Sequence, residues 1–148
     1  MAKLSFSAQI MAFAEKIPGA VEAVFKESVQ EVSAEMLRST NEGGRMRVDT
    51  GFLRNSALAS TTAMPTIKAS ARSVDGQSYP FDFGQIEAVI AGADVDDTIY
   101  VGFTAAYSAY REFGANGQAP DAFVRSAAQN WGSIVDGKAK ELKARLGL

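Results

Sequence analysis

The chain of 148 residues contains no cysteine and no histidine. Without cysteine it cannot form a disulfide framework, a thiolate nucleophile or a zinc–sulfur site. Without histidine it lacks the commonest general base of enzymes and the commonest ligand of transition metals. These absences exclude most familiar catalytic and metal-binding arrangements, and the lack of cysteine suits a reducing compartment.

The sequence also lacks a strong charge of one sign. Its 15 lysines and arginines stand against 17 aspartates and glutamates, for a net charge of −2. A protein that grips the phosphate backbone of nucleic acid needs an excess of cations, because that affinity comes mostly from counterion release. Tight binding to DNA or RNA is therefore not expected.

Long apolar runs are missing as well. No stretch approaches the roughly 20 apolar residues that span a bilayer. The mildly apolar start of the chain is diluted by Gln9 and followed at once by Glu15 and Lys16, so we interpret it as a helix and not as a secretion signal. Hydrophobic residues make up 47% of the chain and charged residues 22%, which is the balance of a globular protein with a core.

Apolar residues recur at steps of three and four through the first quarter of the chain. This spacing predicts a short helix near residues 6–16 and a long helix over 18–39, separated at Pro18 because proline fits only the first turn of a helix. The charged residues of the long helix lie off the apolar stripe and predict a solvated face. Paired glycines at 43–44 should then end the helix in an exposed, mobile loop that carries Arg45 and Arg47.

Short strands are predicted in the middle of the chain. The stretches 57–63, 85–92 and 98–103 are rich in small and β-branched residues and together favour an antiparallel meander. Residues 64–84 contain turn chemistry and little periodicity, so we expect a long surface loop or arm there. The acidic stretch "DVDD" lacks the glycine and the closing glutamate of a calcium loop and is interpreted as a solvated turn.

Helical spacing returns near the C-terminus. The stretch "AAYSAYREFG" predicts a short helix that ends at Gly114, and a final helix is expected from Pro120 onward. Two glycines inside this last helix, Gly132 and Gly137, each cost about 1 kcal/mol relative to alanine. The last helix therefore needs a packing partner. This partner could be the sheet, the long first helix or another subunit.

The stretch "VDTGFLRNSA" at 48–57 suits the start of a small helix. Asp49 or Thr50 can accept hydrogen bonds from the first backbone N–H groups of that helix, and Gly51 allows a tight turn. Arg54 would then project from the helix, free to pair with a carboxylate. The expected apolar anchors are Phe52, Leu53, Ala57 and Leu58. The stretch is not a phosphate-binding P-loop, because it has only one glycine and no lysine after it. No serine has a neighbouring base that would make it a nucleophile, so we do not expect an enzyme.

Three separated stretches together resemble one family. "VDTGFLRNS" is similar to the V-D-T-G-x-L-R-x-S signature of the head–tail joining (neck, or phage tail-component) proteins of long-tailed bacteriophages. "IYVGFTAAYSAYREFG" resembles their Val-Gly strand end followed by a Tyr…Glu-Phe/Tyr-Gly helix end, and "APDAFVRSAAQ" resembles the start of their last helix. Order and spacing agree over roughly residues 20–145. The residues that carry the resemblance are Asp49, Thr50, Gly51, Leu53, Arg54, Tyr107, Tyr110, Glu112, Phe113, Gly114 and Phe123.

The resemblance implies an α+β fold in a single domain over 1–148, with a small antiparallel sheet of about three to four strands packed against a long N-terminal and a C-terminal helix. It also implies a structural role in the virion neck, after assembly in the host cytoplasm. About six or twelve copies would form a ring by head-to-tail contacts. The ring would lie between a head-completion or connector protein and the tail terminator or tail tube. DNA would pass through it non-specifically, and neither membrane, metal nor cofactor is implied.

Two other functions stay open at this point. One is a tail-terminator ring subunit, and the other, from a different class, is a soluble protein-binding regulator module. Two local hypotheses follow from the matched motifs and the loop. Arg54 and Glu112 should meet, within the subunit or across the ring, and residues 64–84 should be disordered in the monomer and ordered by a neighbour.

Overall fold

A computed structural model describes residues 5, 8, 11, 15 and 19–147 of the chain. In this part the fold is α+β, with six α-helices and one two-stranded sheet. The short helix expected near residues 6–16 lies outside the described residues. Among the helices that the structure describes, none is long and apolar enough to cross a membrane.

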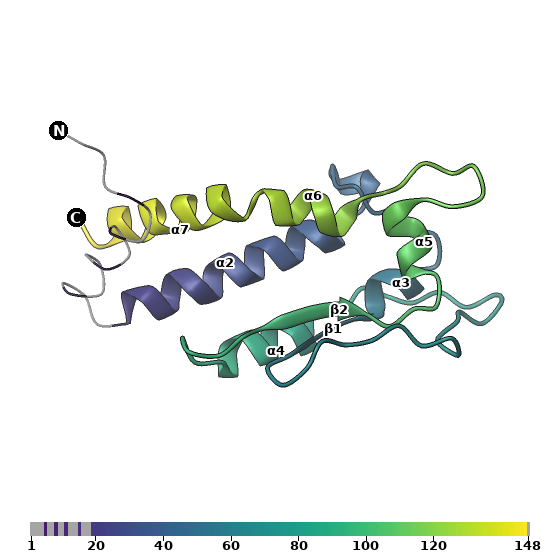
Figure 1. The fold of residues 1–148 in the computed structure, drawn as a ribbon, viewed down its shortest axis with the longest axis horizontal. Coiled ribbons are helices and arrows are strands. Elements are labelled where there is room, and N and C mark those ends of the chain that lie inside the picture. The colour runs from purple at the N-terminus through teal and green to yellow at the C-terminus, as the bar shows by residue number, and fades with distance from the viewer. Residues whose placement is uncertain (1–4, 6–7, 9–10, 12–14, 16–18, 148) are drawn as a thin grey trace.

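Helix α2 (Ala20–Leu37) is the central element of the fold, close to the predicted range. It lies between the pair formed by α6 (Phe123–Gln129) and α7 (Trp131–Arg145) on one side and the layer of sheet and α4 on the other (Figure 1). Its buried side recurs at helical spacing and consists of Ala20, Val24, Ser28, Val29, Ser33, Met36 and Leu37. The apolar stripe of α2 thus faces two layers at once.

The C-terminal helix is divided in two at Asn130. Asn130 has φ −88 and ψ 0, and its side-chain amide donates a hydrogen bond to Glu35 of α2 at 3.2 Å. The predicted solvated face of α2 is partly wrong, because its carboxylates also reach α7. Glu27 pairs with Arg145 at 3.0 Å, and Glu31 lies 4.0 Å from the Lys138 ammonium. Together with the packing of Val24 against Val135 and Ala139, these contacts give α7 the partner its two glycines require.

The sheet contains only β1 (Ala57–Ser60) and β2 (Tyr100–Phe103), which pair antiparallel with Ala57 opposite Phe103. The expectation of three to four strands is wrong, because the third predicted strand, 85–92, is helix α4 (Gly84–Gly92). Ile86 and Ile90 are both buried while Ala88 between them is exposed, which fits the spacing of a helix and not the alternation of a strand.

The side chain of Gln85 takes the place of a third strand. Its Oε1 accepts a hydrogen bond from the Ala59 N–H, and its Nε2 donates one to the Ala59 carbonyl, each at 2.9 Å. One amide group therefore satisfies both backbone groups of Ala59 that a neighbouring strand would have paired.

The main core fills the space between α2, the sheet and α4. Its most deeply buried large side chains include Leu37, Met46, Ile86 and Phe123. Phe123, the first residue of α6, meets Phe103 of β2 edge to face, with the ring centroids 5.1 Å apart. This contact fixes the start of α6 against the end of the sheet, where the short helices α3 (Phe52–Asn55) and α5 (Ser108–Phe113) also lie (Figure 1).

Candidate functional site

The "VDTG" stretch forms the tight turn into α3 that its residue types predict. Of the two expected capping residues, Thr50 accepts a hydrogen bond from the Phe52 N–H at 3.3 Å through its Oγ1, but the N-cap position itself is Gly51, and Asp49 is exposed. Gly51 has φ 89, and a Cβ there would lie 2.2 Å from the Tyr79 carbonyl oxygen. Tyr79 itself donates its N–H to the Thr50 carbonyl at 2.7 Å. Only glycine fits this position, because the backbone of the 64–84 loop crosses directly over it.

That crossing is one of several contacts that the loop 64–84 makes with the rest of the chain. Lys68 donates its backbone N–H to the Thr104 carbonyl at 2.9 Å, and the Ala106 N–H bonds to the Ala71 carbonyl at 2.8 Å. The Asn55 side chain bonds the backbone of residues 80 and 82. The loop contains no helix or strand over 64–83, and its ordering by a neighbouring subunit stays a prediction.

The predicted contact between Arg54 and Glu112 is wrong within the subunit. Arg54 lies over the Phe81 ring, 4.3 Å from its centroid, and its Nη1 is 3.6 Å from Glu42 at the end of η1 (Thr40–Glu42). Glu112 faces the other way, toward the start of α6, where it binds Arg125. The physical reason is that the uncapped N-terminus of α6 offers this carboxylate several donors at once.

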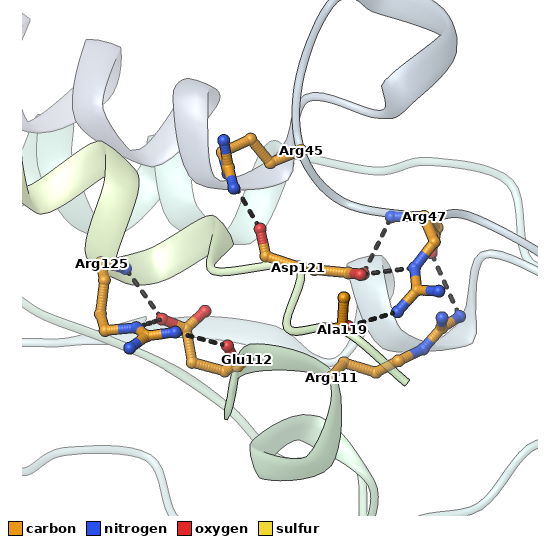
Figure 2. Close-up of polar contacts among 7 residues, drawn as sticks. All are labelled: Arg45, Arg47, Arg111, Glu112, Ala119, Asp121 and Arg125. Atoms are coloured by element: carbon orange, nitrogen blue, oxygen red, sulfur yellow. Dashed lines mark hydrogen bonds and ion pairs between the residues drawn. The ribbon is translucent and has the colours of Figure 1, made fainter. Parts of the chain in front are cut away.

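Glu112 caps α6 from the neighbouring helix (Figure 2). Its carboxylate accepts hydrogen bonds from the backbone N–H groups of Val124 and Arg125, each at 2.9 Å, and from the Arg125 Nε at 3.1 Å. Ala122, which precedes α6, has a φ of 53 and no polar side chain to cap the helix itself. A negative charge at this end also complements the helix dipole. Glu112 is therefore a structural residue that couples α5 to α6.

Asp121 is a second buried carboxylate, and it ties the loop after α2 to the same place (Figure 2). It accepts a hydrogen bond from the Arg47 N–H at 3.2 Å and forms an ion pair with the Arg47 guanidinium. The Arg45 Nε donates to the Asp121 carbonyl at 2.9 Å, and Arg111 donates to the Arg47 carbonyl at 3.3 Å. The loop is exposed at Arg45 and at 41–43, as expected, but its two arginines also bond to Asp121 and are not solvated alone.

The end of α5 follows the prediction. Gly114 terminates the helix with φ 84, and a Cβ there would lie 2.8 Å from the Gln118 carbonyl oxygen. The turn that follows is closed by the Gln118 N–H, which bonds the Ala115 carbonyl at 2.9 Å. A side chain at position 114 would open this turn, which positions Asp121.

Two motif residues contribute little to the core and instead face outward. Tyr110 is 64% exposed and Phe113 is 63% exposed, both on α5, whereas Leu53, Glu112 and Phe123 are buried. Phe113 forms part of a groove of about 280 Å³ whose wall is mostly apolar and includes Pro65, Ile67, Phe103, Phe123 and Val124. Arg125 lines the groove too, and its guanidinium lies 5.0 Å from the centroid of the Phe113 ring. We call this surface the α5 groove.

The remaining motif residue, Tyr107, lines a separate cavity of about 200 Å³ beside the "VDTG" turn. Its ring lies 6.4 Å from that of Phe52, which in turn meets Tyr79 edge to face at 5.1 Å. Burial raises the pKa of the Tyr107 hydroxyl, while the nearby Arg111 guanidinium lowers it in part. This aromatic group fastens the turn to α5 and to the loop 64–84.

Within the described ranges, no cluster of three or more aspartates or glutamates has the geometry to hold a metal ion. Asp121, Arg47 and Arg125 carry most of the polar contacts at this end of the molecule. Neither Asp121 nor Arg125 was expected from the sequence to have such a role, and Arg47 was expected to be solvated. A hint was present for Asp121 alone, since an aspartate just before a helix is a common capping residue. Comparison of the chain with protein-family models, with curated proteins and with solved structures found no match.

Proposed function

We propose that the protein is a structural subunit of a bacteriophage neck, where copies of it form a ring that joins the capsid connector to the tail and lets DNA pass. The proposal rests on the three motif stretches that resemble the head–tail joining family. These stretches are far apart in the sequence, yet α3, α5 and the start of α6 lie together at one end of the molecule (Figure 1). Residues that act in one assembly contact would have this distribution.

The observation that carries the proposal is the exposure of two aromatic residues of α5, Tyr110 and Phe113, of which Phe113 lines the α5 groove. Single exposed apolar residues are ordinary, but two exposed aromatic side chains on one short helix that also lines an apolar groove form a surface suited to protein contact. Aromatic residues are also enriched among those that dominate binding energy at interfaces. Tyr110 and Phe113 would therefore contact a neighbouring subunit.

The charge distribution is compatible with a passage for DNA. Of the arginines in the loop after α2, Arg47 is neutralised by Asp121 and Arg45 is bonded to a backbone carbonyl. A lumen that lets DNA slide should not hold phosphates through many unpaired cations, because each such contact adds affinity. We propose that the ring acts by shape and by contacts between subunits, without catalysis.

Complementation of phage assembly tests this function. The gene for this protein would be disrupted in the phage that encodes it. Cells infected with that mutant phage should then contain filled heads and normal tails that stay separate. Purified protein added to such an extract should restore joined, infectious particles, whereas the Phe113→Ser variant should not. The matched control is Leu146→Ser, an exposed aliphatic residue at the end of α7. Particles that join without the protein would refute the proposal, and tails of irregular length would point to a tail terminator instead.

A further inference from the structure

The turn between α4 and β2 is acidic and presents one apolar residue. Asp94, Asp96 and Asp97 are all exposed, and Val95 among them is 45% exposed. The turn is closed on itself, because the Asp97 N–H bonds the Asp94 carbonyl at 3.0 Å and the Asp97 carboxylate accepts the Asp94 N–H at 2.7 Å. Val95 and Asp96 consequently form its tip. We call residues 94–97 the acidic turn.

No cation close in sequence neutralises the acidic turn. The chain has neither lysine nor arginine between Arg72 and Arg111, a stretch that also includes Glu87 on α4. In space, the Lys26 side chain reaches the Ala91 carbonyl at the end of α4, and its ion pair is with Glu22 of its own helix. The charge at the tip of the turn therefore stays negative and exposed.

The α5 groove has the opposite character. Arg125 lines it with a side chain that is 49% exposed, and Lys68, also exposed, directly follows the groove residue Ile67. The nearby carboxylates, Glu112 and Asp121, are buried and already paired. The groove is thus apolar at its wall, and its apolar residue Ile67 is itself 49% exposed. Arg125 is compensated by Glu112, so the positive charge beside the groove comes from Lys68, while the half-exposed Arg125 guanidinium adds hydrogen-bond donors.

These two surfaces lie at opposite ends of the same strand. The acidic turn precedes Tyr100, the first residue of β2, while Phe103, the last residue of β2, is part of the groove wall. In Figure 1 the turn lies where α4 leads into β2, and α5, whose residues help to line the groove, lies toward the far end of that strand. One copy therefore cannot place its own turn in its own groove.

From this complementarity we infer that the acidic turn of one copy docks in the α5 groove of the next. Val95 would fill the groove against Ile67 and Phe113, while the carboxylates around it would face Arg125 and Lys68. The contact is heterologous, since different surfaces meet, and heterologous contacts generate closed rings when the rotation between copies closes. The inference deepens the proposed neck ring and rests on it for the occupant, a second copy of this chain.

The same charges disfavour contact between two copies of the same surface. Two acidic turns, or two positive groove rims, would face each other with like charge. Such repulsion lowers the affinity of an interface and so suppresses wrong partners. A stable interface also needs about 800 Å² from each partner. The docked turn therefore supplies the register of the contact, and Tyr110 and the loop 64–84 lie where they can add area.

Two variants that each lose one surface test the inference directly. Val95→Arg removes the apolar tip of the turn but leaves the groove intact, and Ile67→Arg blocks the groove but leaves the turn intact. Each alone should be monomeric at concentrations where the wild type assembles, and their mixture should form a one-to-one dimer. Glu87→Arg, which adds the same arginine at an exposed position on α4, is the matched control and should assemble like the wild type. Circular dichroism of each variant verifies that it is folded.

Charge reversal gives a second readout. Asp96→Lys and Lys68→Glu should each weaken assembly by about tenfold at low salt, and the chain that carries both should recover to near the wild-type affinity. If the wild type assembles but the mixture of Val95→Arg and Ile67→Arg stays monomeric, the docking is overturned and the neck ring is left in place. A one-to-one dimer from the mixture, with wild-type copies that form only open chains, would support the docking and overturn the ring. A wild type that never associates would overturn both.

Discussion

Truncation of Glu112 should destabilise the protein more than truncation of its partner Arg125. Glu112→Ala leaves two first-turn N–H groups of α6 without the carboxylate that now accepts them. Loss of a helix cap costs about 0.5–2 kcal/mol, and a buried donor left unsatisfied costs about 1–3 kcal/mol. Because these terms overlap, we expect the free energy of unfolding to fall by about 2–4 kcal/mol.

Arg125→Ala should cost much less. The Arg125 side chain is half exposed, so its ion pair with Glu112 contributes about 1 kcal/mol or less after screening by solvent. Glu112 would lose its counter-ion in this variant but keep both backbone donors, so its carboxylate would stay hydrogen-bonded. The two variants therefore separate the capping role of Glu112 from its ion pair.

Urea denaturation followed by far-ultraviolet circular dichroism measures both effects, with equal m-values as the condition for comparison. Glu141→Ala is the control, since this exposed carboxylate only pairs with Lys138 three residues earlier on α7, a contact worth a few tenths of a kcal/mol. A loss for Arg125→Ala as large as that for Glu112→Ala would refute the capping account. So would a Glu112→Ala variant as stable as the control.

Three further predictions concern single positions. Gly51→Ala should lower the free energy of unfolding by about 2 kcal/mol or more, measured in urea, because alanine must adopt a positive φ and its Cβ would meet the Tyr79 carbonyl. Gly137→Ala should instead raise it by about 0.5–1 kcal/mol, since a Cβ there meets no atom within 4 Å in the middle of α7. Burial raises the pKa of Tyr107, so its neutral form is favoured in the folded state. Stability present below pH 10 should therefore decline as the pH rises beyond that value, and Tyr107→Phe should reduce this decline in alkaline unfolding experiments.

The positions of the long helix, of the end of α5 and of the loop 64–84 were predictable because each follows from local chemistry. Helical spacing of apolar residues marks α2, and glycine marks the end of α5. The prediction of a third strand was wrong, although it too rested on local residue types. Val89 and Ile90 are β-branched and favour a strand, but Ile86 and Ile90 are buried while Ala88 between them is exposed, as in a helix.

The polar contacts at the α5 end were not predictable, because they join residues that lie far apart in the sequence. Arg47 and Asp121 are separated by 74 positions, and nothing local marks them as partners. Motif proximity suggested Arg54 for Glu112, but the unsatisfied donors at the start of α6 decided which group the carboxylate would meet. Only the packing of α5 against α6 shows that requirement.

The mass of the purified protein in solution, combined with negative-stain imaging, tests the central claim most directly. The account predicts closed rings of a single size, about six or twelve copies, with a central hole. A protein that stays a monomer or dimer at every concentration, with no ring in the images, would contradict it and favour a soluble binding module.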